Sequence, residues 1–291
     1  MRLAFLGTPE AAVPSLRALV DAGHDVARVI TRPDRKRGRG AALSASPVKA
    51  CAEELGLSVG DSLSGLDGLD VERGVVVAYG RLIAPDVLAR TPMLNVHFSL
   101  LPRWRGAAPV ERAILAGDVE TGVSIMTLEA DLDTGPVHLE RRVAIDAKSL
   151  TSLLAELATV GAQALVEVLD SPDLLAHPRA QVGDVTYATK LTKEDFHLTS
   201  ESSVAQLLRI VRLGRAFATV GGRRLLVESA SAYDGASVSR GSIALRDGEV
   251  VLGASDGAIA LQRVRPESGK SMSAVAWWSG ARLDEADAQW A

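Results

Sequence analysis

The sequence predicts an α/β protein with a Rossmann-like, open and mostly parallel sheet in an N-terminal domain, followed by a small C-terminal β-barrel of OB-like type. Short apolar runs alternate with helical stretches through the first half, which is the order of an open α/β sheet. Those runs are apolar on both faces, as in a sheet that helices cover on both sides. Closely spaced turn signals after residue 187 predict the barrel.

The first half alternates strands and helices. β-rich apolar runs predict strands at residues 2–6, 26–31, 74–78, 94–98 and 122–128. Helices are predicted at residues 12–22, 47–57, 85–90, 108–116 and 149–169, the last from leucines that repeat with a helical period. The first strand runs directly into the turn Gly7-Thr8-Pro9. Because ligands of such sheets bind at the carboxyl ends of the strands, we expect function at those loops.

The pattern changes near residue 187. Residues 188–199 are polar and aperiodic, and we interpret them as a linker between a domain at residues 1–187 and a domain at residues 200–291. The second domain begins with a predicted helix at residues 202–212 and ends with one at residues 272–279. Between them, turn signals separate short strands: Gly221-Gly222, Asp234-Gly235, Asp247-Gly248 and Asp256-Gly257.

Composition and charge exclude several classes of protein. The chain has 291 residues, a net charge of −4 and one cysteine, Cys51, which rules out an intrachain disulfide framework and a zinc cluster. It has neither an uninterrupted apolar stretch long enough to cross a membrane nor a signal-peptide pattern, so we expect a cytoplasmic protein without a membrane partner. We also expect a monomer.

Positive charge gathers in two stretches. Residues 31–40 carry five basic side chains against the single acid Asp34. A second, acid-free set comprises Arg209, Arg212, Arg215, Arg223 and Arg224. From charge alone, two solvated faces are the favoured interpretation, and nucleic-acid contacts are the alternative.

A polar cluster follows the predicted strands. Alternation along a strand places Asn95 and His97 on the same face, and Asp133 follows a later strand. Asparagine, histidine and aspartate together can polarise a carbonyl, hold an oxyanion and move a proton, which is the equipment for acyl transfer without a covalent intermediate. A structural histidine and a turn-capping aspartate are the alternative interpretation. The sequence contains no P-loop, HExxH motif or Gly-x-Ser-x-Gly elbow, and we predict no metal site.

Several motifs together resemble those of the methionyl-tRNA formyltransferases, in order and in spacing. They are Gly7-Thr8-Pro9-Glu10, residues 32–40, Ser46-Pro47-Val48-Lys49, residues 76–80, residues 95–109, Leu132-Asp133-Thr134-Gly135 and Gly269-Lys270-Ser271-Met272. The Ser-Leu-Leu-Pro stretch with asparagine, histidine and aspartate is common to all folate-dependent formyltransferases. The basic loop followed by Ser-Pro-Val-Lys is more selective, because in that family it contacts the acceptor stem of tRNA.

The resemblance implies that this chain transfers the formyl group of 10-formyltetrahydrofolate to the α-amine of initiator methionyl-tRNA, a step of one-carbon metabolism that serves translation initiation. It implies that Asn95 and His97 stabilise the tetrahedral intermediate and that Asp133 orients or deprotonates the histidine. Folate-binding residues would be Tyr79, Gly80, Leu82, Ile83, Ser99, Leu100, Leu101 and Pro102. tRNA-binding residues would be Arg35, Lys36, Arg37 and Arg39. It also assigns catalysis to residues 1–187 and tRNA binding to residues 200–291.

The chain departs from the family pattern at a few positions. Phe98 follows the catalytic histidine where the family has Gly or Ala, and Asp131 replaces a Gly. The family's Ile-Asp-Trp becomes Phe196-His197-Leu198, and its Asn-Pro-x-Pro-Gly-Ala turn is replaced by residues 213–219. The C-terminal domain is also short.

Three other functions remain as alternatives. A formyltransferase acting on a nucleotide-linked amino sugar would keep Asn95, His97 and Asp133 but would not need the basic loop. An RNA-binding module on the same scaffold would not need those three residues. A dinucleotide-dependent oxidoreductase is disfavoured, because Gly7-Thr8-Pro9 lacks the Gly-x-Gly-x-x-Gly spacing.

Overall fold

The fold is described from a computed structural model, in which residues 1–37, 42–281, 283 and 289–290 are described. The chain divides by contacts into two compact units. The first comprises Met1–Val110, Val119–Asp146 and Leu153–Thr189, and the second comprises Glu111–Asp118, Ala147–Ser152 and Lys190–Ala291. Residues 190–199, predicted as part of a linker, are thus grouped with the second unit. Two short segments of the first half are grouped there as well.

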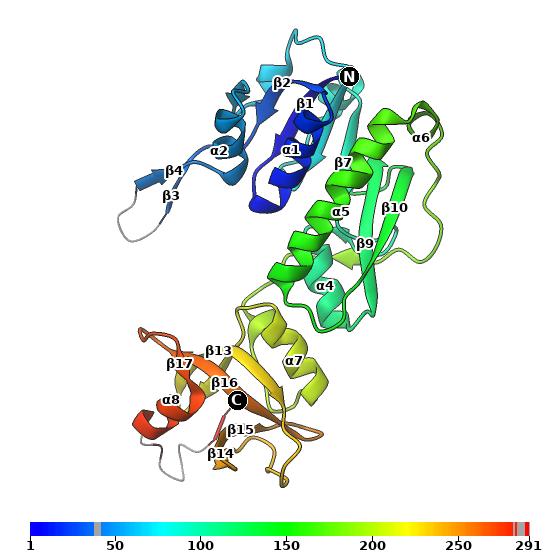
Figure 1. Ribbon diagram of the computed structural model, residues 1–291. Coiled ribbons are helices and arrows are strands. Elements are labelled where there is room, and N and C mark those ends of the chain that lie inside the picture. Colours follow the sequence, from blue (N-terminus) through cyan, green and yellow to red (C-terminus); the bar gives the residue numbers. More distant parts are fainter. Residues whose placement is uncertain (38–41, 282, 284–288, 291) are drawn as a thin grey trace. The chain divides into compact units, whose positions relative to one another are not determined.

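A seven-stranded sheet forms the centre of the first unit (Figure 1). In spatial order its strands are β10 (Val137–Ala144), β9 (Glu120–Thr127), β7 (Met93–His97), β6 (Arg73–Val77), β1 (Arg2–Gly7), β2 (Asp25–Ile30) and β5 (Val59–Gly60). Strands β7, β6, β1, β2 and β5 run parallel. At one edge β9 pairs antiparallel with β7, and β10 pairs antiparallel with β9. The predicted mostly parallel sheet is confirmed, and each of the five predicted strands is present within two residues of its predicted ends.

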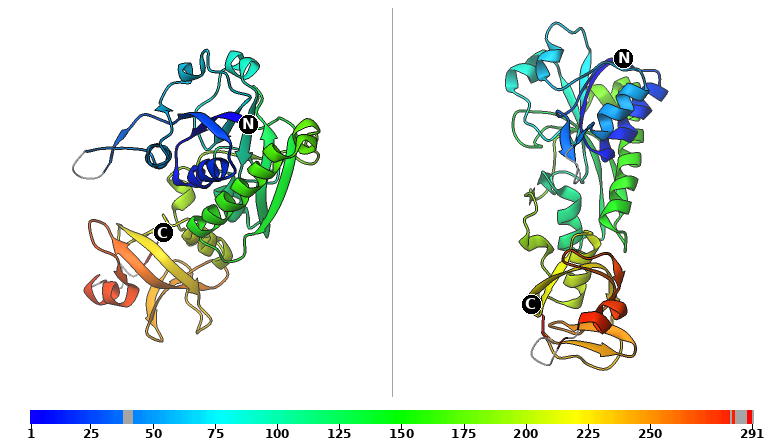
Figure 2. Two further views of the ribbon diagram at one scale, coloured as in Figure 1. Left: turned by 45° about the horizontal axis from the view of Figure 1, so that its top comes forward. Right: turned by 90° about the vertical axis from the view of Figure 1, so that its left-hand side faces the viewer.

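Helices and 3₁₀ turns cover the sheet (Figure 2). They are η1 (Glu10–Ala12), α1 (Val13–Asp21), α2 (Pro47–Glu54), η2 (Leu63–Leu66), α3 (Pro85–Arg90), α5 (Leu150–Asp170) and α6 (Pro172–Ala176). Most of helix α4 (Pro109–Ala116) falls in Glu111–Asp118, which is grouped with the second unit. Helix α2 starts where Ser46 Oγ accepts the backbone N–H of Lys49 at 3.0 Å and Pro47 occupies the first turn. It ends before the predicted residue 57 because Gly56 takes a left-handed φ of 69°.

Helix α5 is a core helix of this unit. Its 21 residues are long and apolar enough to cross a membrane by length and composition alone, with a mean hydropathy of 1.5, but half of that stretch is buried inside the protein. At Gly161 the helix approaches the sheet so closely that an added Cβ would lie 2.9 Å from Val96 Cγ1 and 3.3 Å from Val123 Cγ1. Packing against β7 and β9 therefore accounts for its apolar face.

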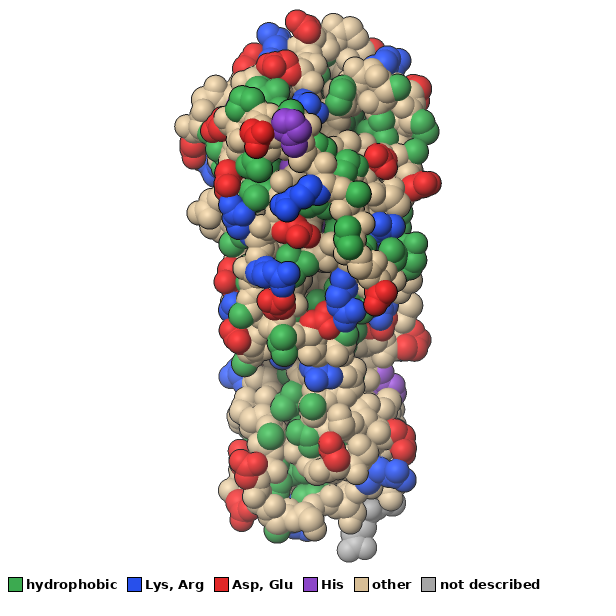
Figure 3. Space-filling view, turned by 90° about the vertical axis from the view of Figure 1, so that its right-hand side faces the viewer, with side chains coloured by type: hydrophobic (Ala, Val, Ile, Leu, Met, Phe, Trp, Pro, Cys, Tyr) green, Lys and Arg blue, Asp and Glu red, His purple; other side chains and the backbone are tan. Residues whose placement is uncertain are grey.

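The edge strand β10 was not predicted. Its sequence alternates buried Val137 and Val143 with charged side chains, as an antiparallel strand with one wet face does. Charged side chains of the strand pair on both faces: Arg142 with Glu120 of β9, and Arg141 with Glu167 of α5 at 2.5 Å. Figure 3 shows acidic and basic side chains intermixed on the face that carries β10 and α6.

The second unit is built on an antiparallel half-barrel sheet, in agreement with the predicted fold class. Its elements are η3 (Glu194–Phe196), α7 (Val204–Arg212), β12 (Phe217–Val220), β13 (Arg223–Ala232), β14 (Ile243–Arg246), β15 (Glu249–Gly253), β16 (Ala258–Pro266), β17 (Met272–Ser273) and α8 (Ala274–Ala281). The last helix starts two residues later than predicted, because Met272 and Ser273 pair with β16 instead.

Turn chemistry sets the hairpins of this sheet. Gly221 and Gly222 join β12 to β13 with φ of 52° and 71°, and Asp247 and Gly248 join β14 to β15 with φ of 50° and 80°. Two positive φ angles in a two-residue loop match the right-handed twist of the flanking strands. The core between sheet and α7 consists of buried apolar side chains, among them Leu207, Ile210, Leu225, Val227, Leu252 and Val264.

Candidate active site

The predicted site lies at the carboxyl ends of the parallel strands. The strand order reverses between β1 and β6, since β2 and β5 follow β1 on one side and β6 and β7 lie on the other. The loops that leave these strands meet there. Thr8 Oγ1 donates to the carbonyl of Tyr79 and accepts from the N–H of Arg32, each at 3.4 Å. A reversal of strand order is the usual place for a ligand in such sheets.

Asn95 and His97 share the face of β7 that points away from α5. Parallel register pairs Asn95 with Val76, and Val76 with Leu6. Leu6 and Val76 belong to the core cluster that η2 and α3 cover. The intervening Val96 instead meets α5 at Gly161. The predicted placement of Asn95 and His97 on one face is therefore confirmed.

The structure brings Asp133 to His97. Asp133 Oδ2 lies 3.6 Å from His97 Nδ1, and the two side chains are 9% and 6% exposed. On its other side, Asp133 Oδ2 accepts the backbone N–H of Gly106 at 2.8 Å. The carboxylate is thus fixed by a backbone donor and faces the imidazole at a distance longer than a hydrogen bond.

A carbonyl oxygen holds the other side of the imidazole. His97 Nε2 lies 2.9 Å from the oxygen of Trp104, so this nitrogen donates, because a carbonyl oxygen only accepts. Asn95 is 9% exposed, and its side-chain amide makes no hydrogen bond to another described residue. Donor capacity at Asn95 is therefore available to a bound molecule.

Three side chains outside the predicted set hold this arrangement together. Gln181 Nε2 donates to the carbonyls of Asp133 and Gly135, each at 2.8 Å. Gln181 Oε1 accepts from Arg105 Nε and Nη2 at 3.0 and 2.6 Å. Ser124 Oγ accepts the N–H of Leu101 at 3.1 Å and donates to the carbonyl of Ser99 at 2.7 Å. Arg105 lies within the motif at residues 95–109, whereas Gln181 and Ser124 belong to no motif, so only the fold could reveal those two.

Backbone strain concentrates at the same place. Ala78, Trp104 and Asp133 have φ of 47°, 64° and 51°, which residues with a Cβ rarely adopt. Each lies on a loop that follows a strand of the sheet. Conformations of this kind persist where the surroundings determine them strongly, and they cluster at functional sites.

The Ser99–Pro102 segment forms the turn after β7. Ser99 is fully buried and its Oγ donates to the carbonyl of Arg103 at 2.6 Å. Leu101 packs against Met126 and Val137, and the Leu101–Pro102 peptide is cis. Leu100 covers Gly122, where an added Cβ would lie 2.5 Å from its Cδ2.

The loop after β6 combines buried and exposed positions. Tyr79 and Ile83 are 1% and 9% exposed, and they belong to the cluster with Leu6 and Val76. Leu82 is 86% exposed. The hydroxyl of Tyr79 is buried and has no hydrogen-bond partner within the described part of the chain. Gly80 takes a φ of 75° beside the Arg32 guanidinium.

Residues 35–37 form strand β3 (Arg35–Arg37), which pairs antiparallel with β4 (Ala42–Ser44). The hairpin carries three of the residues predicted to bind tRNA, Arg35, Lys36 and Arg37. Arg39, the fourth, lies outside the described residues. At the base of the hairpin, Asp34 Oδ2 pairs with Lys49 Nζ at 2.7 Å, and this bond raises the pKa of Lys49. Among the described residues, no group of three or more potential ligands could hold a metal ion.

Comparison with known proteins identifies the class. A formyl transferase family model matches residues 1–169, and a model of the formyl transferase C-terminal domain matches residues 190–282. The open α/β sheet with Asn95, His97 and Asp133 at its carboxyl edge agrees with that match. The chain belongs to the formyl transferase family.

Curated relatives place it more closely, among the methionyl-tRNA formyltransferases. That of Jannaschia sp. is 43% identical over 97% of this chain and 98% of its own length. That of Clavibacter sepedonicus is 40% identical over 96% of this chain and 97% of its own length.

Solved structures share the fold at lower identity. The N-formyltransferase of Helicobacter canadensis matches with a TM-score of 0.69 at 15% identity, over 89% of this chain and 98% of that chain. Methionyl-tRNA formyltransferase from Clostridium thermocellum matches with a TM-score of 0.56 at 15% identity, over 81% of this chain and 95% of that chain. HypX from Aquifex aeolicus matches with a TM-score of 0.67 at 19% identity, and this chain spans 48% of its length.

Proposed function

We propose that this chain transfers the formyl group of 10-formyltetrahydrofolate to the α-amino group of initiator methionyl-tRNA, in the cytoplasm and as a monomer. The observation that carries the proposal is the cluster of Asn95, His97 and Asp133 at the carboxyl end of β7. Its support in sequence is the match over nearly the full length to methionyl-tRNA formyltransferases.

The residues divide the chemistry as follows. Asn95 offers an amide N–H to the carbonyl oxygen on which negative charge develops, and comparable donors contribute roughly 3–4 kcal/mol in other enzymes. His97 lies on the same face and stabilises that charge as an imidazolium, because its Nε2–H donates to the Trp104 carbonyl and its Nδ1 faces Asp133. Asp133, fixed by Gly106, orients the imidazole and stabilises positive charge on it. The amine nitrogen forms a bond to the formyl carbon, and the bond from that carbon to N10 of the folate then breaks. The amine gives a proton to the His97–Asp133 pair, and N10 takes up a proton as it leaves.

The folate donor supplies an activated formyl group. Two features of the loop after β6 fit a flat, polar ring system: the buried and unpartnered hydroxyl of Tyr79, and the exposed apolar side chain of Leu82. We assign folate binding to Tyr79, Gly80, Leu82 and Ile83, with Ser99, Leu100, Leu101 and Pro102 as the opposite wall. The side-chain amide of Asn95 can donate a hydrogen bond to the formyl oxygen of a donor bound there.

We assign tRNA contacts to Arg35, Lys36, Arg37 and Arg39, and catalysis to residues 1–187. Basic residues on a hairpin suit the phosphate backbone, whose neutralisation dominates the affinity of nucleic-acid binding. Residues 200–291 contribute further RNA contacts. An amino sugar attached to a nucleotide is the competing acceptor, since it would use the same three catalytic residues.

Transfer of labelled formyl from 10-formyltetrahydrofolate tests the acceptor directly. Initiator methionyl-tRNA, elongator methionyl-tRNA and nucleotide-linked amino sugars are compared at equal concentration. We expect labelling of initiator methionyl-tRNA at the highest kcat/KM. Labelling of a sugar alone, or of no acceptor, would refute the assignment.

A further inference from the structure

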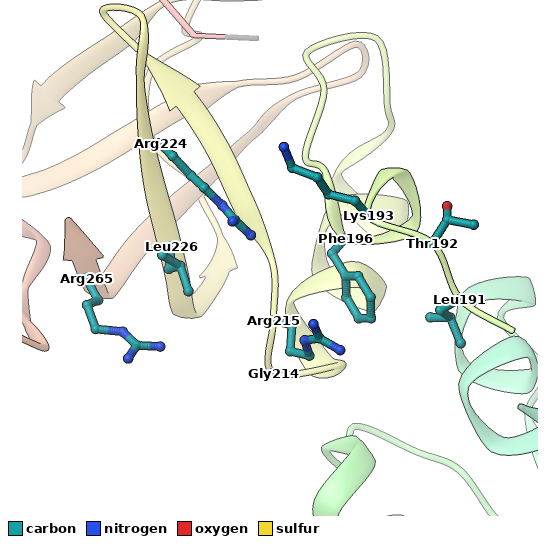
Figure 4. Close-up of a pocket in the computed structure, with 9 residues that line it drawn as sticks. All are labelled: Leu191, Thr192, Lys193, Phe196, Gly214, Arg215, Arg224, Leu226 and Arg265. Carbon is teal, nitrogen blue, oxygen red and sulfur yellow. The ribbon is translucent and has the colours of Figure 1, made fainter. Parts of the chain in front are cut away.

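A cavity in the second unit is lined in part by residues at which this chain departs from the family pattern. It has a volume of about 490 Å³, and its walls include Lys193, Phe196, Arg215, Arg224, Leu226 and Arg265 (Figure 4). Phe196 belongs to the segment that replaces Ile-Asp-Trp, and Arg215 to the segment that replaces the proline-rich turn. The two departures, separate in sequence, therefore meet in one wall. A cavity of this size accommodates a group considerably larger than a single ion.

The cavity is basic and largely uncompensated. Arg265 Nε lies 3.3 Å from Glu228 Oε1, whereas Lys193, Arg215 and Arg224 have no carboxylate within ion-pair distance among the described residues. Figure 4 shows the guanidinium groups of Arg224 and Arg265 directed into the space that Phe196 and Arg215 border. Arg224 Nε is buried without a hydrogen-bond acceptor in the described part of the chain. An uncompensated guanidinium with such a donor favours an anionic ligand.

Aromatic rings hold these cations in place. The Arg215 guanidinium lies over Phe196 at 4.7 Å, and that of Arg224 lies over Phe217 at 4.0 Å. His197 stacks on Phe217 with ring centroids 4.7 Å apart. Each guanidinium is thus positioned by a cation–π contact before any ligand arrives, which lowers the entropy cost of binding.

Two other arginines of the second basic stretch, Arg209 and Arg212, have structural partners. Arg212 Nε donates to the carbonyl of Lys148 at 2.8 Å. The Arg209 guanidinium packs on Gly117, where an added Cβ would lie 2.2 Å from it. Arg215 and Arg224 are the members of that stretch which line the cavity.

We propose that this cavity binds a phosphate group of the RNA backbone of the tRNA substrate, with Arg215 and Arg224 as its main ligands and Lys193 at its rim. The proposal rests on tRNA being the substrate. Arginine forks match phosphate oxygens in a bidentate manner, and Phe196 and Leu226 provide an apolar wall for the adjoining ribose. The departures from the family pattern thus create an RNA contact that belongs to this chain.

The test measures binding of deacylated initiator tRNA, so that it does not depend on formyl transfer. Arg215→Gln and Arg224→Gln are compared with Arg246→Gln, an exposed arginine of β14 whose Nη1 donates to the carbonyl of Leu245. We expect Kd to rise about ten- to hundredfold in the double variant and to stay unchanged in the control. The slope of log Kd against log salt should fall by about 1.

Further measurements separate the outcomes. Thermal unfolding checks that each variant is folded, and Lys193→Gln provides a weaker version of the same test if Arg224→Gln does not fold. Inorganic phosphate, added as a competitor, distinguishes a tRNA phosphate from a small phosphorylated ligand. The proposal would be overturned if phosphate saturated the cavity while the arginine variants bound tRNA with wild-type affinity. An equal loss of tRNA affinity in Arg246→Gln would also overturn it. Failure of the wild type to formylate methionyl-tRNA would instead contradict the proposed function.

Discussion

Replacement of Asp133 by asparagine isolates the contribution of one negative charge. Asparagine has nearly the same shape, so its oxygen retains the hydrogen bond from the Gly106 N–H at 2.8 Å while the charge beside His97 is removed. Asp133 Oδ2 lies 3.6 Å from His97 Nδ1, and both side chains are buried. At an effective dielectric constant of about 20, a unit charge at that distance stabilises an imidazolium by about 4–5 kcal/mol.

This energy corresponds to a fall in kcat of roughly a thousandfold, because about 1.4 kcal/mol changes a rate tenfold. Single-turnover formyl transfer from 10-formyltetrahydrofolate to methionyl-tRNA measures it without interference from product release. Asp131→Asn is the matched control. It also removes one carboxylate charge, but from an exposed side chain two residues before Asp133. A rate within threefold of the wild type for Asp133→Asn, or an equal fall for Asp131→Asn, would refute this role of the carboxylate.

Three further changes test the surroundings of the site. Gln181→Leu should lower kcat about five- to tenfold with little change in KM for the folate donor, because the carbonyls of Asp133 and Gly135 lose their shared donor. Gln181→Glu should have the same effect on kcat. A change confined to KM would contradict a positioning role for Gln181. Gly161→Ala should lower the free energy of unfolding by about 1–3 kcal/mol, because the added Cβ would press on Val96. The control is Gly280→Ala, whose Cβ would meet only open space. Its free energy of unfolding should stay within about 1 kcal/mol of the wild type. Burial lowers the pKa of His138, so the unfolded chain binds more protons than the folded one below about pH 6.5, and stability is lost as the pH falls. Urea unfolding at several pH values should show a smaller acid loss in His138→Gln, and an identical loss would contradict the assignment to this histidine.

The sequence was sufficient to predict the elements whose signal is local. The backbone conformation of a strand or a tight turn depends on adjacent residues, such as the apolar run at residues 94–98 or the turn Asp247-Gly248. The strands, the hairpins and the shared face of Asn95 and His97 could therefore be predicted. Strand β10 was missed because Glu140, Arg141 and Arg142 give it a polar sequence, which is normal for an edge strand with a wet face.

Features that depend on distant pairing were out of reach. Nothing near Gln181 marks it as a partner of Asp133, because its role arises when residues 178–188 fold back across the sheet edge. The basic cavity is a similar case. Phe196 and Arg215 appeared as unrelated departures from a pattern until the fold stacked one on the other.

The bond between Gln181 and Asp133 also limits when the catalytic cluster can become complete during synthesis of the chain. The two residues are 48 positions apart, which a ribosome adding roughly 5–20 residues per second covers in about 2–10 s. Over that interval the nascent chain already contains Asn95, His97 and Asp133, but the Asp133 loop has no Gln181 to hold it. A chain arrested before residue 181 would therefore carry the reactive side chains without the fixed geometry, and activity is expected to appear only after the returning segment has emerged.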